Sequence, residues 1–96
     1  MAKENFLDTL EQTITDRLAN PQAESYTSSL AAMGVKRVAQ KVGEEAVELA
    51  LASVDGERDE LLDEAADLVF HVLVLLHVRD ASWRDVLATL KSRHSG

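Results

Sequence analysis

The chain has 96 residues, no cysteine and a net charge of −7, which is enough length for one domain with a modest core. The lack of cysteine excludes a disulfide framework and a thiolate metal site. The acidic balance, without a basic stripe to neutralise phosphates, argues against a nucleic-acid partner. The longest apolar run, 68–78, is shorter than the ~20 residues of a membrane span, and residues 1–5 lack the apolar core of a signal peptide. We therefore predict one cytoplasmic domain over residues 1–96.

The first half of the chain predicts two helices. Apolar residues at helical spacing indicate a helix from about residue 4 to 19. Asn20-Pro21 ends it, because the residue before a proline is disfavoured in the helical conformation. Residues 20–25 are then a loop. Ser25 or Thr27 can cap a short helix that reaches Met33, where Gly34 interrupts the pattern.

The second half predicts two long helices and a shorter one. A third helix runs from about residue 35 to 54, and Asp55-Gly56 is a turn signal before a fourth helix over about 57–79. The latter half of that helix is apolar on almost every side, which is typical of a buried helix. Ser82, with Asp85 three residues on, caps a last helix that ends near His94. No segment alternates as a strand does. The prediction is an all-α fold, a compact bundle of four to five helices in which the two long ones are antiparallel.

Two acidic clusters lie within the two long helices: Glu44-Glu45-x-x-Glu48 and Glu64-x-x-Asp67. At about 100° per residue, Glu45 and Glu48 share one helix face, and so do Glu64 and Asp67. If the helices pack antiparallel across the turn, all four carboxylates face one another, and they cannot all stay ionised without a cation. Hard oxygen ligands favour Mg²⁺, with Mn²⁺ as the alternative, so the pattern predicts a metal site and phosphate chemistry.

A solvated helix face is the ordinary explanation for acids at this spacing, and such a face usually carries basic partners four residues later. Here those positions hold Leu49, Ala52 and Leu68. The acids also border the apolar stripes of their helices, where carboxylates would be costly without a compensating cation. The pattern therefore favours a metal site over a solvated face.

The strings around these acids resemble a known family. They are Gln40-Lys41-Val42-Gly43-Glu44-Glu45-Ala46-Val47-Glu48, then Asp63-Glu64-Ala65-Ala66-Asp67-Leu68 and His71. They are similar to the phosphoribosyl-ATP pyrophosphohydrolases of histidine biosynthesis. The bare E-E-x-x-E and E-x-x-D pair marks only the wider class of all-α nucleotide pyrophosphohydrolases, whereas the first string and Ser25-Tyr26-Thr27 are much more specific. The resemblance covers residues 4–94.

The resemblance implies the second step of histidine biosynthesis. In that step, water attacks the α–β phosphoanhydride of 1-(5-phosphoribosyl)-ATP in a Mg²⁺-dependent reaction that gives phosphoribosyl-AMP and pyrophosphate. The metal ligands it implies are Glu45, Glu48, Glu64 and Asp67, with the number of ions left open. The catalytic set it implies is Glu44, Glu45 and Glu48, in which Glu44 supports the site or helps to activate water. Some relatives carry a cyclohydrolase domain in the same polypeptide, and we expect the stand-alone form here.

Three basic residues are candidate phosphate contacts. Lys41 lies one turn before Glu45 and can reach a phosphate or pair with that glutamate. Lys36 and Arg37 lie in the first turn of their helix, where anions are favoured, and can bind the second phosphate-bearing arm or form a solvated pair. The family commonly has a lysine shortly after its S-Y-T motif, where this chain has Ser28-Ser29, so one phosphate contact is in doubt.

Tyr26, Thr27 and His71 complete the predicted substrate contacts. Tyr26 can pack on the base or ribose, or anchor the start of a helix, and Thr27 lies beside it in the same string. His71 extends the line of Glu64 and Asp67 by one turn and can orient a carboxylate, although a lone histidine on an apolar face is usually a core residue. His77 and Trp83 are interpreted as packing residues.

Two other functions stay open. The first is a housecleaning (d)NTP pyrophosphatase of the same class, which would share the acidic motif. The second is a non-catalytic helical dimerisation module in which the acids bind metal only structurally. The fourth helix has more apolar surface than a 96-residue bundle can cover, which predicts an obligate homo-oligomer. The resemblance implies a homodimer, or a higher homo-oligomer, with sites near the subunit interface.

Overall fold

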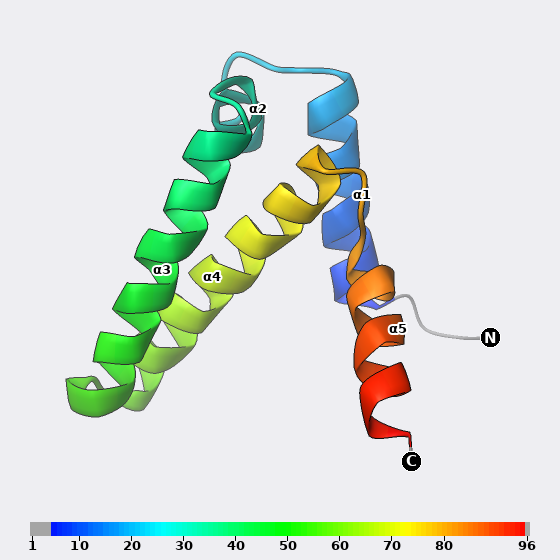
Figure 1. The fold of residues 1–96 in the computed structure, drawn as a ribbon. Helices are drawn as coiled ribbons and strands as arrows, with labels where there is room; N and C mark the ends of the chain where they lie inside the picture. The colour runs from blue at the N-terminus through cyan, green and yellow to red at the C-terminus, as the bar shows by residue number, and fades with distance from the viewer. Residues whose placement is uncertain (1–4, 96) are drawn as a thin grey trace.

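A computed structural model of the chain describes residues 5–95. This part consists of five helices and no strand: α1 (Phe6–Ala19), α2 (Tyr26–Ala32), α3 (Val35–Asp55), α4 (Arg58–Val78) and α5 (Trp83–His94). Figure 1 shows α3 and α4 side by side as an antiparallel hairpin, with the end of α4 leaning across α1 and α5 descending from that corner. The predicted all-α fold is confirmed, and the helix bounds agree within two residues. The predicted start at residue 4 lies outside the described residues.

The helix starts follow the local sequence. Ser25, rather than Thr27, caps α2 by accepting a hydrogen bond from a main-chain N–H. Ser82 and Asp85 form a complete capping box at the start of α5, in which each side chain accepts from the main-chain N–H of the other residue. Gly34 precedes α3 with a φ of +92°, a conformation that a residue with a side chain rarely adopts. These signals are local, which is why the sequence predicts the starts of these helices well.

The core is small and lies where α4 crosses α1 and α2. Its fully buried members are Ile14, Leu30, Val38, Leu73 and Val74. No residue of α5 is buried. The latter half of α4, predicted to be buried, is mostly half-buried in the single chain. Apolar surface is therefore left uncovered on several helices. Within residues 5–95, no helix combines the length and apolarity that a membrane span needs.

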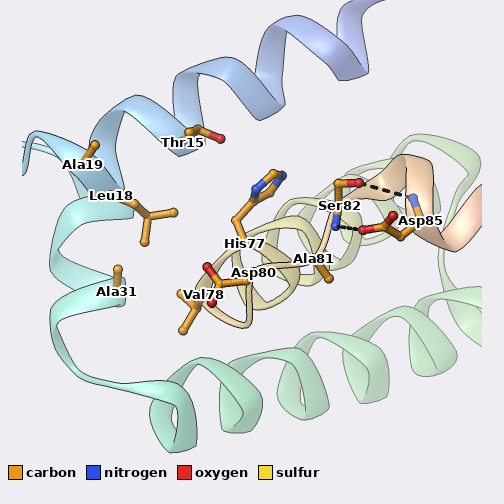
Figure 2. Close-up of a pocket in the computed structure, with 10 residues that line it drawn as sticks. All are labelled: Thr15, Leu18, Ala19, Ala31, His77, Val78, Asp80, Ala81, Ser82 and Asp85. Atoms are coloured by element: carbon orange, nitrogen blue, oxygen red, sulfur yellow. Dashed lines mark hydrogen bonds between the residues drawn. The ribbon is translucent and has the colours of Figure 1, made fainter.

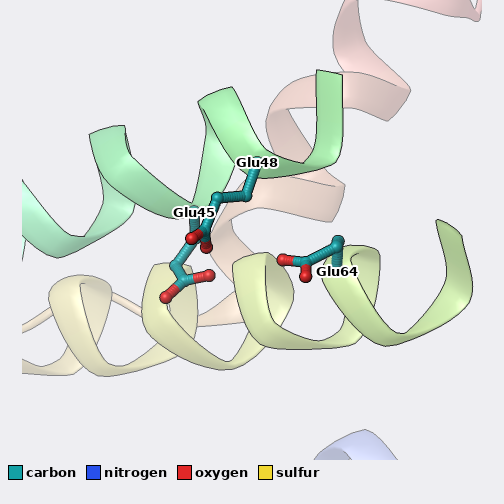
Figure 3. Close-up of side chains that lie close together, drawn as sticks. All are labelled: Glu45, Glu48 and Glu64. Atoms are coloured by element: carbon teal, nitrogen blue, oxygen red, sulfur yellow. The ribbon is translucent and has the colours of Figure 1, made fainter. Parts of the chain in front are cut away.

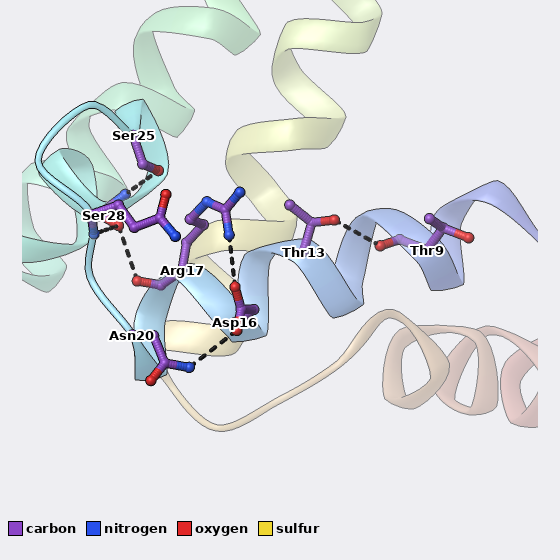
Figure 4. A network of polar contacts seen from close by, with 8 residues as sticks. Thr9, Thr13, Asp16, Arg17, Asn20, Ser25 and Ser28 are labelled. Carbon is purple, nitrogen blue, oxygen red and sulfur yellow. Dashed lines mark hydrogen bonds and ion pairs between the residues drawn. The ribbon is translucent and has the colours of Figure 1, made fainter.

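The loop between α1 and α2 is fixed by one buried hydroxyl. Ser28 Oγ donates a hydrogen bond to the main-chain oxygen of Arg17 at 3.0 Å and accepts one from the N–H of Gln22 at 3.1 Å (Figure 4). The N–H of Ser28 donates in turn to Ser25 Oγ at 3.1 Å. Ser28 therefore ties the short helix α2 to the end of α1. Its hydroxyl makes both of these hydrogen bonds within the connection from α1 to α2.

A second polar junction joins α1, α4 and α5. One carboxylate oxygen of Glu11 accepts hydrogen bonds from His77 Nε2 and from the main-chain N–H of Trp83. The sequence interpretation of His77 as a packing residue therefore omits a polar partner that lies 66 positions away in the chain. His77 also borders a pocket at this corner, with Thr15 across from it and Ser82 beside it (Figure 2). The pocket contains none of the residues predicted for the site.

The end of α4 offers a test of backbone strain. Asp80 has a φ of 60°, and it follows Arg79 in a helix-ending motif where the N–H of Ala81 bonds to the oxygen of Leu76 and that of Asp80 to the oxygen of His77. Glycine adopts this conformation without steric cost, so Asp80→Gly should stabilise the fold by about 0.5–1 kcal/mol, which is roughly 4–8 °C in Tm per kcal/mol for a domain of this size. Thermal unfolding by circular dichroism measures the shift. The control Asp80→Ala, which keeps the Cβ, should give no gain; equal gains from both variants would assign the effect to the lost charge.

Candidate functional site

The α3–α4 hairpin brings three of the predicted carboxylates together. Glu45 and Glu48 come from adjacent turns of α3, and Glu64 comes from the facing turn of α4 (Figure 3). One oxygen from each carboxylate lies within 4.8 Å of the others. The antiparallel packing predicted from the sequence is therefore what assembles the cluster.

Two oxygens of this cluster are buried and have no hydrogen-bond donor. Glu45 is only 7% exposed, and its Oε2 atom has no partner within the described residues. The same holds for Oε2 of the half-buried Glu64 across the hairpin. Leaving a buried acceptor unsatisfied costs about 1–3 kcal/mol, and more when the group is charged. A divalent cation between the helices would satisfy both oxygens, so the residues fit a hard metal ion.

The carboxyl groups of the cluster shift one another's pKa values. The hydrogen bond with Glu45 and repulsion from Glu45 and Glu64 raise the pKa of the Glu48 carboxyl. The hydrogen bond from Glu48, followed by that from Lys41, lowers the pKa of Glu45 despite its burial. The pKa of Glu48 therefore lies above the ordinary glutamate value and that of Glu45 below it.

Basic side chains line the α3 side of the cluster. Lys41 Nζ lies 3.3 Å from Glu45 Oε1 and 3.8 Å from Glu44 Oε1. Pairing with Glu45 raises the pKa of Lys41. Arg37 lies 3.8 Å from Glu44, and Gln40 donates a hydrogen bond to the same carboxylate at 2.9 Å. Glu44 is thus outside the three-carboxylate cluster, and its own carboxylate contacts Arg37, Gln40 and Lys41.

Asp67, Lys36 and Thr27 are not drawn into the cluster. Asp67 is exposed on α4, and its carboxylate does not join the three that converge. Lys36 is exposed in the first turn of α3, which fits the solvated pair as well as the phosphate contact. Thr27 is 8% exposed in α2. Their proposed roles as ligand and substrate contacts stay predictions.

Tyr26 and His71 meet beside the cluster. The Tyr26 hydroxyl lies 2.9 Å from His71 Nε2, and His71 Nδ1 lies 2.7 Å from the main-chain oxygen of Asp67. The structure therefore gives His71 these two partners, and the carboxylate partner foreseen from the sequence is not among them. The contact between Tyr26 and His71 spans 45 positions, and nothing in the local sequence signals it.

An all-α bundle in which a long helical hairpin gathers three carboxylates, with two buried unsatisfied oxygens among them, is consistent with the class of all-α nucleotide pyrophosphohydrolases. Residues 7–94 match the family described as phosphoribosyl-ATP pyrophosphohydrolase, and the chain belongs to that family. It is therefore related to hydrolases of histidine biosynthesis.

The chain is also similar to curated relatives named histidine biosynthesis bifunctional protein HisIE. It is 49% identical to the protein of Vibrio cholerae over 89 residues, which are 93% of this chain and 42% of the relative. It is 51% identical to the protein of Pasteurella multocida over 90 residues, which are 94% of this chain and 45% of the relative. The chain thus spans less than half the length of these relatives.

The raised pKa of Glu48 predicts a pH-dependent stability in the absence of divalent ions. A folded-state pKa above the unfolded value contributes stability at acid pH, and this contribution is lost as pH rises through the folded pKa. Glu48→Gln mimics the protonated carboxyl at every pH. The variant should therefore melt close to wild type in acid and above it at neutral pH, measured by thermal unfolding in EDTA.

With divalent ions present at neutral pH, wild type should melt above Glu48→Gln, the reverse of the order expected in EDTA. Mn²⁺ should raise the Tm of wild type at neutral pH and raise that of Glu48→Gln far less, because the variant lacks one ligand. The exposed loop residue Glu24 provides a control, since Glu24→Gln should follow wild type in both series. Equal Mn²⁺ shifts for wild type and Glu48→Gln would rule out Glu48 as a ligand.

Proposed function

We propose that this chain hydrolyses phosphoribosyl-ATP to phosphoribosyl-AMP and pyrophosphate. The oxygen of a water molecule bonds to a phosphorus of the α–β anhydride, the P–O bond to the bridging oxygen breaks, and the protons of the water pass to the products or to solvent. The observation that carries the proposal is the family match over residues 7–94 combined with the two unsatisfied carboxylate oxygens between α3 and α4. Neither alone would connect the substrate with the site.

The metal in this proposal is Mg²⁺, with Mn²⁺ as a substitute. Glu45, Glu48 and Glu64 would hold it, with Asp67 as a fourth ligand from the exposed edge of α4. When bound, such an ion neutralises phosphate charge and lowers the pKa of a coordinated water. Glu45 supports this assignment best. Its Oε1 pairs with Lys41, whereas its buried Oε2 has no hydrogen-bond partner and is therefore available to a cation.

The remaining residues bind and orient the substrate in this proposal. Lys41 and Arg37 extend along α3 beside the carboxylates, where they can bind phosphate oxygens. Lys36 precedes them at the positive end of the α3 dipole and suits the second phosphate-bearing arm. Glu44, within reach of Lys41 and Arg37, keeps these cations in place and is the candidate to assist in activating water. Thr27 and Tyr26 of α2 form the neighbouring wall.

Substitution of the cluster tests the chemistry. Glu48→Gln and Glu64→Gln should each lower turnover of phosphoribosyl-ATP by at least about a hundredfold, because each removes charge stabilisation worth several kcal/mol. Glu57→Gln, a carboxylate lost at the tip of the hairpin, is the matched control and should stay near wild type. Release of pyrophosphate in a coupled assay measures all three. Retained turnover in both cluster variants would exclude the site.

A housecleaning (d)NTP pyrophosphatase is the competing function, since it would use the same carboxylates. Turnover of phosphoribosyl-ATP compared with a panel of dNTPs separates the two. The proposal requires a higher kcat/KM for phosphoribosyl-ATP, and a preference for dNTPs would reject it.

A purely structural helical module is excluded if Glu48→Gln loses turnover while it keeps the fold and oligomeric state of wild type.

We further propose that two or more copies associate through α3. Val47, Leu51 and Val54 form an apolar stripe on its outer face, with 59%, 63% and 78% of their surfaces exposed. Their spacing is that of a helix-packing seam. The stripe adjoins Glu48, so a second copy seated there would also shield the metal site.

Leu51→Lys tests this association. A charge in the centre of the stripe should shift the mass measured by size exclusion with light scattering toward that of one chain, because a lysine cannot be buried there without a partner. Ser53→Lys places the same charge away from the stripe on the same helix and should leave the mass unchanged. A wild-type chain that elutes as a stable monomer would refute the proposal.

A further inference from the structure

A chain of two hydrogen bonds runs from α4 to the start of α2. The main-chain oxygen of Asp67 can only accept, so His71 Nδ1 must carry the proton at the 2.7 Å contact. In the neutral imidazole, Nε2 is then an acceptor, and the Tyr26 hydroxyl donates to it at 2.9 Å. The direction of both bonds is thus fixed by the helix carbonyl, and one tautomer of His71 holds the tyrosine.

The two partners differ sharply in exposure. His71 is 5% exposed, whereas Tyr26 is 53% exposed. The tyrosine ring meets His71 edge to face at a centroid distance of 5.7 Å and lies tilted against Phe70 at 6.2 Å. The His71 and Phe70 rings are themselves perpendicular, at an angle of 87°. The hydroxyl end of Tyr26 is therefore tied down while much of its ring surface is open to solvent.

This open ring adjoins the carboxylate site. Asp67 and Glu64 lie one and two turns before His71 on α4. Lys41 lies near enough that the Tyr26 phenol contributes to its raised pKa, after the larger effect of Glu45. A nucleotide whose phosphates lie on the α3 cations and carboxylates would thus have an aromatic surface within reach of its base.

We propose that His71 is a positioning residue, whose hydrogen bond holds the Tyr26 ring as a preformed wall for the flat purine base of the substrate. The inference rests on the proposed function and adds to it the division of labour in this pair: Tyr26 touches the base, and His71 acts only through Tyr26. A tied ring loses no rotational freedom when the base binds, whereas a free ring does. His71 therefore affects substrate binding without contact with the substrate.

Three substitutions separate the contributions of the Tyr26 ring, the Tyr26 hydroxyl and the His71 acceptor. Tyr26→Phe keeps the ring and removes the donor. His71→Asn replaces the Nδ1 side of the ring and cannot reach Tyr26, whereas His71→Gln reaches the place of Nε2 and can still accept from the hydroxyl. We expect Tyr26→Phe and His71→Asn each to raise KM for phosphoribosyl-ATP about twofold to tenfold, the entropic range of one freed side chain, with kcat within about twofold of wild type.

The pair should behave as one unit. The double variant Tyr26→Phe/His71→Asn should raise KM no further than either single variant, because both remove the same bond. His71→Gln should lie closer to wild type than His71→Asn. Mn²⁺ binding in the absence of nucleotide, measured by calorimetry, should be unchanged in all of them.

The single tyrosine allows a direct test without turnover. Protein labelled with 3-fluorotyrosine has one ¹⁹F resonance, from Tyr26, and adenosine 5′-monophosphate with Mg²⁺ should shift it. In His71→Asn the same shift should need about twofold to tenfold more nucleotide. Trp83, the single tryptophan, lies beyond the far end of α4, so a 5-fluorotryptophan label should not respond.

Each outcome decides the inference. An unchanged KM in Tyr26→Phe, a loss of kcat in place of a rise in KM, or a matching loss of Mn²⁺ affinity would overturn it, as would a Tyr26 resonance that ignores the nucleotide. Tyr26 is half exposed, so the Tyr26→Phe result stands even if the His71 variants fold poorly. Failure of the proposed function is separately visible, because wild type would then not hydrolyse phosphoribosyl-ATP at all.

Discussion

The mutual repulsion of three carboxylates, held together between α3 and α4, is the constraint to which the surrounding structure responds. Glu45, Glu48 and Glu64 lie within 4.8 Å of one another, and two of their oxygens are buried without a donor. Lys41 pairs with Glu45, and the neighbouring carboxylates raise the pKa of Glu48. Both leave the buried oxygens unsatisfied. A divalent cation between the two helices would satisfy both oxygens.

The core and the site lie at different ends of α4. Ile14, Leu30 and Leu73 pack where the end of α4 crosses α1 and α2, while Glu64 lies near the beginning of α4. The apolar core at the end of α4 therefore stabilises the packing of the α3–α4 hairpin. The carboxylates near the beginning of α4 remain available for binding. The outer face of α3 is apolar and adjoins the site. A second copy seated there would lower the local dielectric around the carboxylates and strengthen their hold on a cation.

The sequence predicted most of what depends on local chemistry. Helical periodicity, Asn20-Pro21 and the Ser82 cap set the helices within two residues, and the i, i+3 spacing of the acids set their shared faces. The rest depends on how helices meet. Glu11 and His77 are 66 positions apart and Tyr26 and His71 are 45 apart, so no periodicity links them. The four expected carboxylates reduce to three in close contact because the facing turns of α3 and α4 bring Glu64 inward and leave Asp67 at the edge.

The short helix α2 links these parts. Seven residues are too few for a helix to be stable alone in water, so tertiary contacts must hold α2 in place. Ser28 fixes it to the end of α1 through two main-chain groups, and Tyr26 fixes it to α4 through His71. Ser28 stands in the stretch where the family resemblance led us to expect a lysine, and its hydroxyl is bonded within the loop. In the proposed function, the cations of α3 beside the carboxylates would supply the phosphate contact that such a lysine would make. Substrate binding would then be divided between α2, which supplies the aromatic wall, and α3, which supplies the positive charge.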